Sequence, residues 1–542
     1  MPEGTAVRVV ELERPLQGQR RPATAAVGRA TWPRLRPDLL VVGGLMVLAA
    51  GIRLPTIHRA FWVDEGISVG IASHRLAQVP GLLRLDGSPP LFYALLHFWI
   101  RAFGSTPLST HTMSLLTSLA VVPIAWWCGE TLFGRNAARA AALLAATNPF
   151  LNWYATETRM YPLVCCLAML AVTFSVRAIR LNRLTDAALA VVAVTALLYT
   201  HNWSLYLFAV LGGVLTVRAI VRRDTRQAIG VAAAAAAVAV AYAPWLPTFL
   251  SQAHHTAAPW AVRPTVGDFF VDPTSALGGT MGIVVVPLLA LALVATWLLT
   301  TVEDRRTASL VGGVGLLTIV LGWLAAQLEP SWTSRYLAVP LGLLLLGLAG
   351  ALAGTWLGRR VIGVVAVILI AWSIIGSLLP DANATYSKSN VAAIASAARP
   401  FVSPGDVVIV TQTEQVAALA YYLPAGLRFF TPTGPVADPR VVDWRDLVAR
   451  LAAADPCSTL GPELNAVPRG GHILVVNPYR HLGASGTRWA RTVNAKVVAV
   501  NALLNSPGLT RLTSFEEAIQ PKPYSAVTGL LFVRTTGAVS CR

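Results

Sequence analysis

Long apolar runs recur through the first two thirds of this 542-residue chain and limit what it can fold into. A run of about 17 to 25 apolar residues is long enough to cross a bilayer as a helix. Hydrophobic residues make up 55% of the chain and charged residues only 13%, a balance that soluble globular proteins do not show. The sequence therefore predicts an α-helical polytopic membrane protein with eleven spans, at residues 37–57, 109–129, 137–153, 160–178, 185–200, 203–221, 228–246, 280–300, 308–327, 335–356 and 361–379.

The arginines predict which side of the membrane each loop occupies. A further run at 89–103 is short and aromatic, and we interpret it as an interfacial helix rather than a span. With that choice, thirteen arginines fall in short inner loops, against Arg159, Arg263 and Arg335 in short outer loops. Cytoplasmic loops carry an excess of Lys and Arg, so we place the amino terminus inside and expect a long first outer loop at 58–108. The excess of 43 basic over 26 acidic residues is then a topology signal, and we expect no nucleic-acid partner.

The two ends of the chain differ from the spans. Residues 1–36 are polar and lack the apolar core of a signal peptide, which predicts a disordered cytoplasmic tail. From residue 380 to 542, β-branched runs alternate with helical patterns and predict an extracytoplasmic α/β domain. Outside the cytoplasm, Cys457 and Cys541 could form a disulfide. The expected strands of this domain are at 406–411, 472–477 and 530–536, and its expected helices are at 415–423 and 444–454.

An FWVDE segment, Phe61–Glu65, lies in the predicted outer loop shortly after the first span. Two adjacent acids beside a membrane are costly unless they bind a charge or take part in chemistry. A carboxylate such as Asp64 or Glu65 could deprotonate an acceptor hydroxyl, with Trp62 beside it in the aromatic belt. The plain alternative is a solvated loop with an acidic helix start.

A second group of polar and aromatic residues falls in the NWYATETRMYPL segment, 152–163, at the outer end of the third predicted span. Glu157 could orient a hydroxyl or a cation, and Arg159 could bind a phosphate. Tyr161 offers a stacking face for a sugar ring. Alternatively, the acid and the arginine pair only with their neighbours.

Other candidates lie at the outer ends of later spans. Arg335 and Tyr336 begin the tenth predicted span, where a guanidinium can reach a lipid phosphate. His201, His254 and His255 are expected on the same side as cavity-lining residues. Adjacent histidines do not share a helix face, so the last two do not predict a metal site.

Several of these motifs occur in a recognisable order. The DE pair in a long outer loop, the PPL that begins the 89–103 run, an FGR turn at 133–135 and a Y-x-x-E-x-R-M-Y segment together resemble the GT-C superfamily of membrane glycosyltransferases. The likeness is to its family 39-like enzymes, which include protein O-mannosyltransferases and the lipid A aminoarabinose transferase. It covers about residues 37–380 and is strongest over 58–165.

The resemblance implies that a sugar is moved from a polyprenyl-phosphate carrier to a hydroxyl acceptor at the outer face of the membrane. Asp64 matches the catalytic acid position, and we expect it to be the general base of an inverting transfer, assisted by Glu65 or Glu157. Because a lipid phosphate is a good leaving group, the remaining need is for cations that stabilise its charge, and Arg159 and Arg335 are the candidates.

The same resemblance gives expectations for partners and location. An Arg- and Ala-rich composition is typical of high-GC bacteria, which favours the bacterial cytoplasmic (inner) membrane and mannose or arabinose as the sugar. The acceptor would be an envelope glycan, lipid or protein recruited by the C-terminal domain. GT-C members differ in their need for a cation: no cofactor is required, although Asp64 and Glu157 could hold Mg²⁺ or Mn²⁺.

Two readings from other classes stay open. A transporter or lipid-linked sugar flippase predicts ionisable residues near span centres, whereas the acids and arginines here cluster at the outer ends. A non-catalytic scaffold would tolerate loss of the acids. The sequence has neither a D-x-D motif nor a Gly-rich phosphate loop, which argues against a nucleotide-sugar donor and an ATP-driven transporter.

Overall fold

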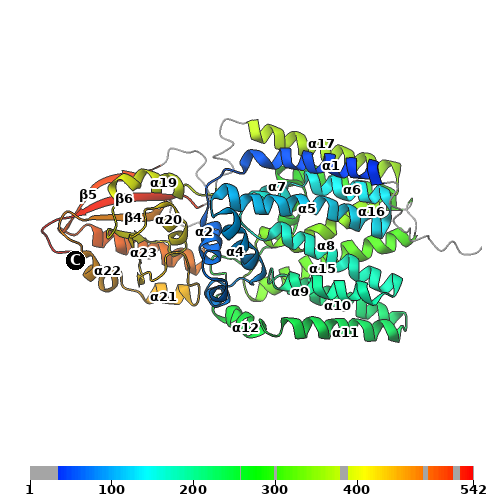
Figure 1. The fold of residues 1–542 in the computed structure, drawn as a ribbon, viewed down its shortest axis with the longest axis horizontal. Coiled ribbons are helices and arrows are strands. Elements are labelled where there is room, and N and C mark those ends of the chain that lie inside the picture. The colour runs from blue at the N-terminus through cyan, green and yellow to red at the C-terminus, as the bar shows by residue number, and fades with distance from the viewer. Residues whose placement is uncertain are drawn as a thin grey trace, which may run out of the picture.

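The computed structural model describes residues 35–256, 258–297, 299, 302–378, 388–479, 486–516 and 525–540. It has two parts, a bundle of long helices and a smaller α/β domain at one end of the bundle (Figure 1). The tail predicted at 1–36 lies outside the described residues except for its last two, where the first helix begins.

The bundle is formed by long apolar helices that run roughly side by side (Figure 1). Among the described residues, nine stretches are long and apolar enough to cross a membrane, and they match nine of the eleven predicted spans. The chain is therefore a multi-pass membrane protein. The helices of the bundle are α1 (Leu35–Arg53), α5 (Pro107–Phe133), α6 (Arg135–Thr147), α7 (Pro149–Ala155), α8 (Tyr161–Leu181), α9 (Leu184–Leu198), α10 (Ser204–Val221), α11 (Thr225–Tyr242), α13 (Val266–Gly278), α14 (Gly282–Trp297), α15 (Val302–Leu328), α16 (Ala338–Leu352) and α17 (Trp356–Leu378).

The two remaining predicted spans correspond to shorter helices. The run at 137–153 is divided between α6 and α7, because Asn148 leaves helical geometry and its side chain accepts a hydrogen bond from the backbone N–H of Leu151. Pro149 then begins α7, the helix position that proline tolerates best. The run at 185–200 forms α9, which has 15 residues.

Short helices occupy the end of the bundle that faces the α/β domain. They are α2 (Val63–Ala72), α3 (Val79–Asp86), α4 (Leu91–Phe103) and α12 (Leu246–His255), and α2 and α4 lie at the junction of the two parts (Figure 1). With 13 residues, α4 is about 20 Å long, too short to span, in agreement with the prediction for 89–103. Its buried His97 ring places Nδ1 2.9 Å from the carbonyl of Ala72, which fixes α4 against the end of α2.

The C-terminal domain is a six-stranded mixed sheet with helices on both faces. Strand order is β3-β2-β1-β4-β6-β5, with β1 parallel to β2 and β4 and the other pairs antiparallel. Helices α19 and α20 share an apolar core with one face of the sheet, and α22 and α23 share a core with the other. The three predicted strands and two predicted helices are confirmed. The elements are β1 (Val407–Val410), β2 (Arg428–Thr431), β3 (Gly434–Pro435), β4 (His472–Pro478), β5 (Leu509–Phe515), β6 (Val527–Arg534), α19 (Val391–Ala398), α20 (Val416–Tyr422), α21 (Leu447–Ala453), α22 (Pro456–Asn465) and α23 (Arg488–Leu504).

The domain docks directly on α2, the helix that carries the DE pair. A Cβ placed on Gly66 would lie 2.7 Å from the backbone of Ala418 in α20, so only glycine permits this approach. Just before α2, the backbone N–H of Phe61 donates to the hydroxyl of Tyr422 at 2.7 Å. Helix α2 is therefore held between the bundle and the α/β domain.

Candidate active site

The two acids of the FWVDE segment lie in the first turn of α2 and have different surroundings. Trp62, just before the helix, is extended, and its backbone N–H donates to Glu65 Oε2 at 3.4 Å, which caps the helix start. Consecutive residues of a helix point about 100° apart. Asp64 and Glu65 consequently face different partners.

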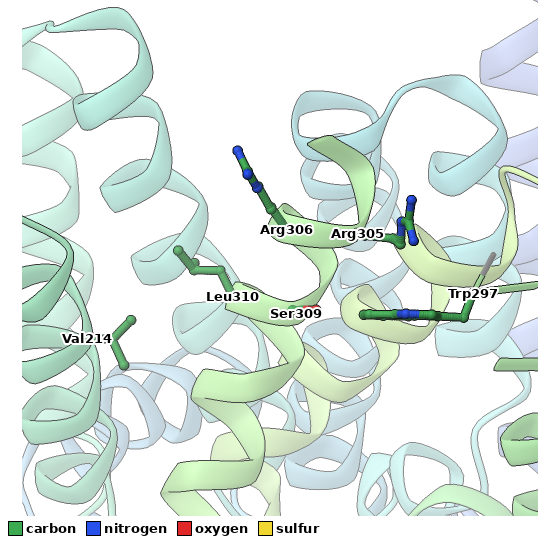
Figure 2. A pocket seen from close by; sticks show the side chains of 6 residues that line it. All are labelled: Val214, Trp297, Arg305, Arg306, Ser309 and Leu310. Atoms are coloured by element: carbon green, nitrogen blue, oxygen red, sulfur yellow. The ribbon is translucent and has the colours of Figure 1, made fainter. Parts of the chain in front are cut away.

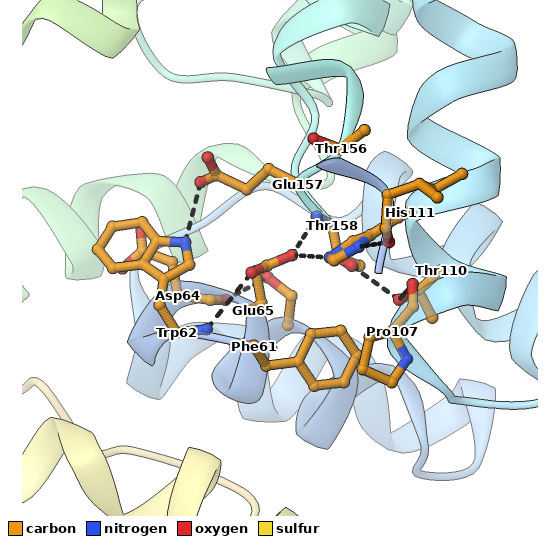
Figure 3. A network of polar contacts seen from close by, with 12 residues as sticks. Phe61, Trp62, Asp64, Glu65, Pro107, Thr110, His111, Thr156, Glu157 and Thr158 are labelled. Atoms are coloured by element: carbon orange, nitrogen blue, oxygen red, sulfur yellow. Dashed lines mark hydrogen bonds and ion pairs between the residues drawn. The ribbon is translucent and has the colours of Figure 1, made fainter. Parts of the chain in front are cut away.

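Glu65 is buried among donors that come from three segments. Its Oε1 accepts from the backbone N–H of Thr158 at 2.7 Å and lies 2.6 Å from His111 Nε2 (Figure 3). The other ring nitrogen of His111 faces the carbonyl of Ile57 at 2.7 Å, so both nitrogens have acceptors and the ring is a doubly protonated cation. Burial alone would raise the pKa of Glu65, but His111 and the Thr158 N–H outweigh it and lower that pKa.

These contacts bear on the predicted role of Glu65. Both carboxylate oxygens are engaged, and the pair ties α2 to α5 and to the loop before α8. A buried carboxylate held in this way suits the positioning of α2 better than proton transfer. A direct catalytic role for Glu65 stays a prediction.

Asp64 faces two guanidinium groups instead. Its Oδ2 lies 3.4 Å from Arg335 Nη1 and 4.0 Å from Arg159 Nη2, and the side chain keeps 18% of its surface exposed. Arg159 also donates to the hydroxyl of Ser68, one turn along α2, at 3.0 Å. Two cations thus share one carboxylate, which leaves a surplus positive charge at the end of the bundle beside an accessible acid.

Predicted aromatic and histidine residues pack behind these arginines. The guanidinium of Arg159 lies 5.8 Å from the ring centre of Tyr161, and Tyr336 packs edge-on against His201 at 4.8 Å between ring centres. Burial, together with Arg159 and Arg335, lowers the pKa of His201 to about 3. His201 is therefore a neutral member of this wall.

Glu157 is buried on the other side of Trp62. Its Oε1 accepts from the indole N–H of Trp62 at 3.1 Å, and its Oε2 forms an ion pair with Lys388 (Figure 3 shows the indole contact). The structure thus brings together the residues named as site candidates in the sequence, which are Asp64, Glu65, Trp62, Glu157, Arg159, Tyr161, His201, Arg335 and Tyr336.

Three members of this cluster were not predicted from the sequence. His111 lies among other polar residues at the start of a span. Lys388 lies more than 200 residues later in the chain, just before the α/β domain. The third, Asp86, accepts a hydrogen bond from Tyr93 Oη at 3.2 Å, and burial raises its pKa. Two features of the sequence could have pointed to them. Lysine is rare in this chain, and Asp86 lies just before the PPL that begins the 89–103 run.

The side chains predicted to hold a divalent cation do not fit one. Asp64 already faces two arginines, and Glu157 is paired with a lysine. Carboxylates that bind Mg²⁺ or Mn²⁺ need their oxygens free for the metal. Across the described ranges, no group of three or more His, Cys, Asp or Glu is placed to hold an ion.

Two other predicted features lie elsewhere. His255 at the end of α12 is exposed and lies 3.0 Å from Asp446 of the α/β domain, so it lies at the junction of the two parts and outside the cluster around Asp64. His254 precedes it on the same helix. Cys457 lies in the first turn of α22, whereas Cys541 lies outside the described residues, and their disulfide stays a prediction.

A cavity of about 540 Å³ lies near the start of α15 (Figure 2). Arg305 is roughly 35 Å from Leu328, the other end of this helix, after which the chain reaches Arg335. The cavity contains no acid, and we do not assign the chemistry to it. Its lining residues are Val214, Trp297, Arg305, Arg306, Ser309 and Leu310.

The arrangement of long spans, short helices in the first large loop and a terminal α/β domain is a fold that this chain shares with solved structures. The chain is similar to ArnT from Cupriavidus metallidurans in the apo state, with a TM-score of 0.60 and 15% identity over 92% of this chain and 98% of that one. It is also similar to the same protein bound to undecaprenyl phosphate, with a TM-score of 0.57 and 13% identity over the same shares.

A third similar structure is the arabinofuranosyltransferase AftD from mycobacteria. Its TM-score is 0.50 at 16% identity, and the match covers 93% of this chain but 40% of AftD. No family model and no curated protein matches the sequence. At these identities the likeness establishes the fold, and the chemistry must be argued from the site.

Proposed function

We propose that this protein is a glycosyltransferase that moves a sugar from a polyprenyl-phosphate donor to a hydroxyl acceptor at the outer face of the bacterial cytoplasmic membrane. The solved structure of ArnT with undecaprenyl phosphate supports a donor of this kind. The arabinofuranosyltransferase AftD supports a sugar such as arabinose, with mannose as the other candidate.

The observation that carries the proposal is the cluster of Asp64, Arg159 and Arg335. Two largely buried guanidinium groups converge on one partly exposed carboxylate, from segments that are far apart in the chain. Arginine binds phosphate well because its planar donors match phosphate oxygens. A donor phosphate would supply the negative charge that this cluster lacks.

In the proposed reaction, the acceptor oxygen attacks the anomeric carbon of the sugar as the bond from that carbon to the phosphate oxygen breaks. The phosphate leaves with the bonding electrons and is stabilised by the two arginines. Asp64 takes the proton of the acceptor hydroxyl as general base. Attack from the face opposite the phosphate inverts the anomeric centre.

The buried residues around the cluster would hold this geometry. Glu65 and His111 fix the start of α2, and so the position of Asp64. Tyr161, Tyr336 and neutral His201 form a wall that limits water near the phosphate. Trp62 provides a face on which a sugar ring can stack.

The test is transfer of radiolabelled sugar from polyprenyl-phosphate mannose or arabinose by purified protein, with envelope extract as acceptor. Asp64→Asn should reduce the rate by about 100-fold or more. Asp268→Asn, which alters a partly exposed acid at the start of α13, is the matched control and should transfer normally. Full transfer by Asp64→Asn would contradict the assignment of the base.

Two further outcomes bear on the alternatives. Failure of the wild-type protein to transfer either sugar, combined with donor movement across vesicles, would favour the flippase. Labelling of a cysteine introduced at the exposed residue Arg469 tests the orientation, because we expect the α/β domain outside. Reaction only from the cytoplasmic side would place the site on the wrong face for this donor.

A further inference from the structure

Lys388 links the α/β domain to the site. Its backbone carbonyl accepts from both the N–H and the hydroxyl of Ser525, at 2.8 and 2.7 Å. Two residues later, Asn390 exchanges a pair of side-chain hydrogen bonds with the backbone of Val527, at 2.9 and 2.8 Å. The backbone around Lys388 is thereby fixed to the start of β6.

The side chain of Lys388 points away from its own domain and enters the transmembrane part. Its ammonium pairs with Glu157 and lies 4.5 Å from the ring centre of Trp62, 4.9 Å from that of Trp153 and 5.1 Å from that of Tyr154. Aromatic faces attract a cation, more strongly when it is shielded from water. The three rings and the carboxylate together fix the position of the Lys388 ammonium.

This contact favours the charged form of Glu157. Burial raises the pKa of that carboxyl, the Lys388 ammonium opposes the rise, and the nearby carboxylates of Glu65 and Asp64 add to it. Without the ammonium, Glu157 would lie among the carboxylates of Glu65 and Asp64, and His111 would be the cation that still acts on it. Glu157 would then take up a proton more readily.

A protonated Glu157 would hold Trp62 less firmly. The indole N–H of Trp62 donates to Glu157 at 3.1 Å, and the face of the same indole lies 6.0 Å from the guanidinium of Arg335. Arg335 in turn contacts Asp64 at 3.4 Å. A continuous set of contacts thus runs from the α/β domain to the acid proposed as the base.

We propose that Lys388 is a positioning residue for sugar transfer: the α/β domain supplies it to keep Glu157 charged, and Glu157 fixes Trp62 beside Arg335 and Asp64. The inference rests on the proposed function for the reaction itself. It gives the α/β domain a part in building the site, in addition to recruiting an acceptor.

The experiment measures donor kcat/KM for Lys388→Met, Lys388→Arg, Glu157→Gln and the double variant Glu157→Gln/Lys388→Met. Lys388→Met should lower kcat/KM roughly 100-fold, as expected for a small displacement in a site. Lys388→Arg keeps the charge and should recover most of the activity. The matched control is Lys496→Met, which should leave kcat/KM unchanged. Lys496 lies on α23 and donates to the carbonyl of Ala454.

Two readouts separate positioning from a merely structural role. If Lys388 acts through Glu157, the double variant is within about threefold of Glu157→Gln, because the second change removes nothing more. The acidic limb of the pH-rate profile should also move to higher pH in Lys388→Met, and this shift should be absent in the double variant. The inference would be overturned if the losses in kcat/KM of the two single variants multiplied in the double variant. It would also be overturned if the acidic limb of Lys388→Met did not move.

The outcomes also distinguish the two proposals. Wild-type transfer with an unaffected Lys388→Met contradicts the role of Lys388 and leaves the proposed function intact. No wild-type transfer contradicts the proposed function, and hydrogen exchange then tests the contacts alone: Lys388→Met should speed exchange in 63–72 relative to Lys496→Met. Unchanged exchange there would contradict the proposed link.

Discussion

The adjacent acids Asp64 and Glu65 allow a sharp test, because the same chemical change should have opposite consequences at the two positions. Glu65→Gln removes the charge that a buried, doubly donating His111 faces at 2.6 Å. Asp64→Asn removes a charge from a side chain that is 18% exposed and contacts its arginines at 3.4 and 4.0 Å. Each variant keeps the size and shape of the side chain.

The magnitudes follow from burial. Removing one partner of a buried ion pair costs about 3 to 5 kcal/mol, since the other charge stays buried without compensation. Glutamine retains one oxygen that can still accept from Thr158, so we expect Glu65→Gln to lower the free energy of unfolding by about 3 kcal/mol. The longer and more accessible pairs of Asp64 predict a change of about 1 kcal/mol or less for Asp64→Asn.

The assay is SDS titration of the purified proteins in mixed micelles, followed by sugar transfer on the folded fraction. Asp64→Asn should stay folded and lose transfer, whereas Glu65→Gln should unfold at lower SDS and retain part of its transfer per folded molecule. A stable Glu65→Gln with no transfer would mean that Glu65 takes part in the chemistry, and would refute the division of roles argued from these contacts.

Three more predictions follow from the same structure. The folded state lowers the pKa of Glu65, so its contribution to stability is complete above about pH 4.5 and is lost as the pH falls further; SDS titration at several pH values should show this loss in wild type and not in Glu65→Gln. Gly66→Ala would drive a methyl group into the backbone of Ala418 and should cost about 1 to 3 kcal/mol of stability. Gly81 has open space around it, so Gly81→Ala should cost nothing measurable. Equal effects would contradict the close docking of α2 on α20. Arg335→Met should weaken binding of undecaprenyl phosphate roughly 10- to 150-fold, the value of a hydrogen bond to a charged group, while the exposed Arg263→Met should not; unchanged binding would exclude Arg335 from the phosphate site.

Much of the architecture could be predicted because it depends on local composition. Nine predicted spans match long apolar helices, and the strands at 407–410, 472–478 and 527–534 lie where β-branched runs predicted them. The break between α6 and α7 was missed, although Asn148 and Pro149 are visible in the sequence, because an apolar run was treated as continuous. Hydropathy reports burial and does not locate the ends of a helix.

Local sequence also indicated which side chains are available for chemistry. Acids and arginines at the ends of apolar runs are costly in a membrane. Together with the predicted topology and the family resemblance, this cost led us to group Asp64, Glu157, Arg159 and Arg335. The sequence could not assign different roles to Asp64 and Glu65, because neighbouring residues have the same local sequence.

The different surroundings of Asp64 and Glu65, and the remaining members of the site, became visible only in the folded chain. Glu65 is paired with a histidine 46 residues away, and Glu157 with a lysine 231 residues away in another domain. A buried charge is stable only where an opposite charge and hydrogen-bond donors reach it, and the fold of the whole chain determines which groups do so. The roles of Glu65, His111 and Lys388 therefore follow from packing, because the segments that supply them meet only in the folded protein.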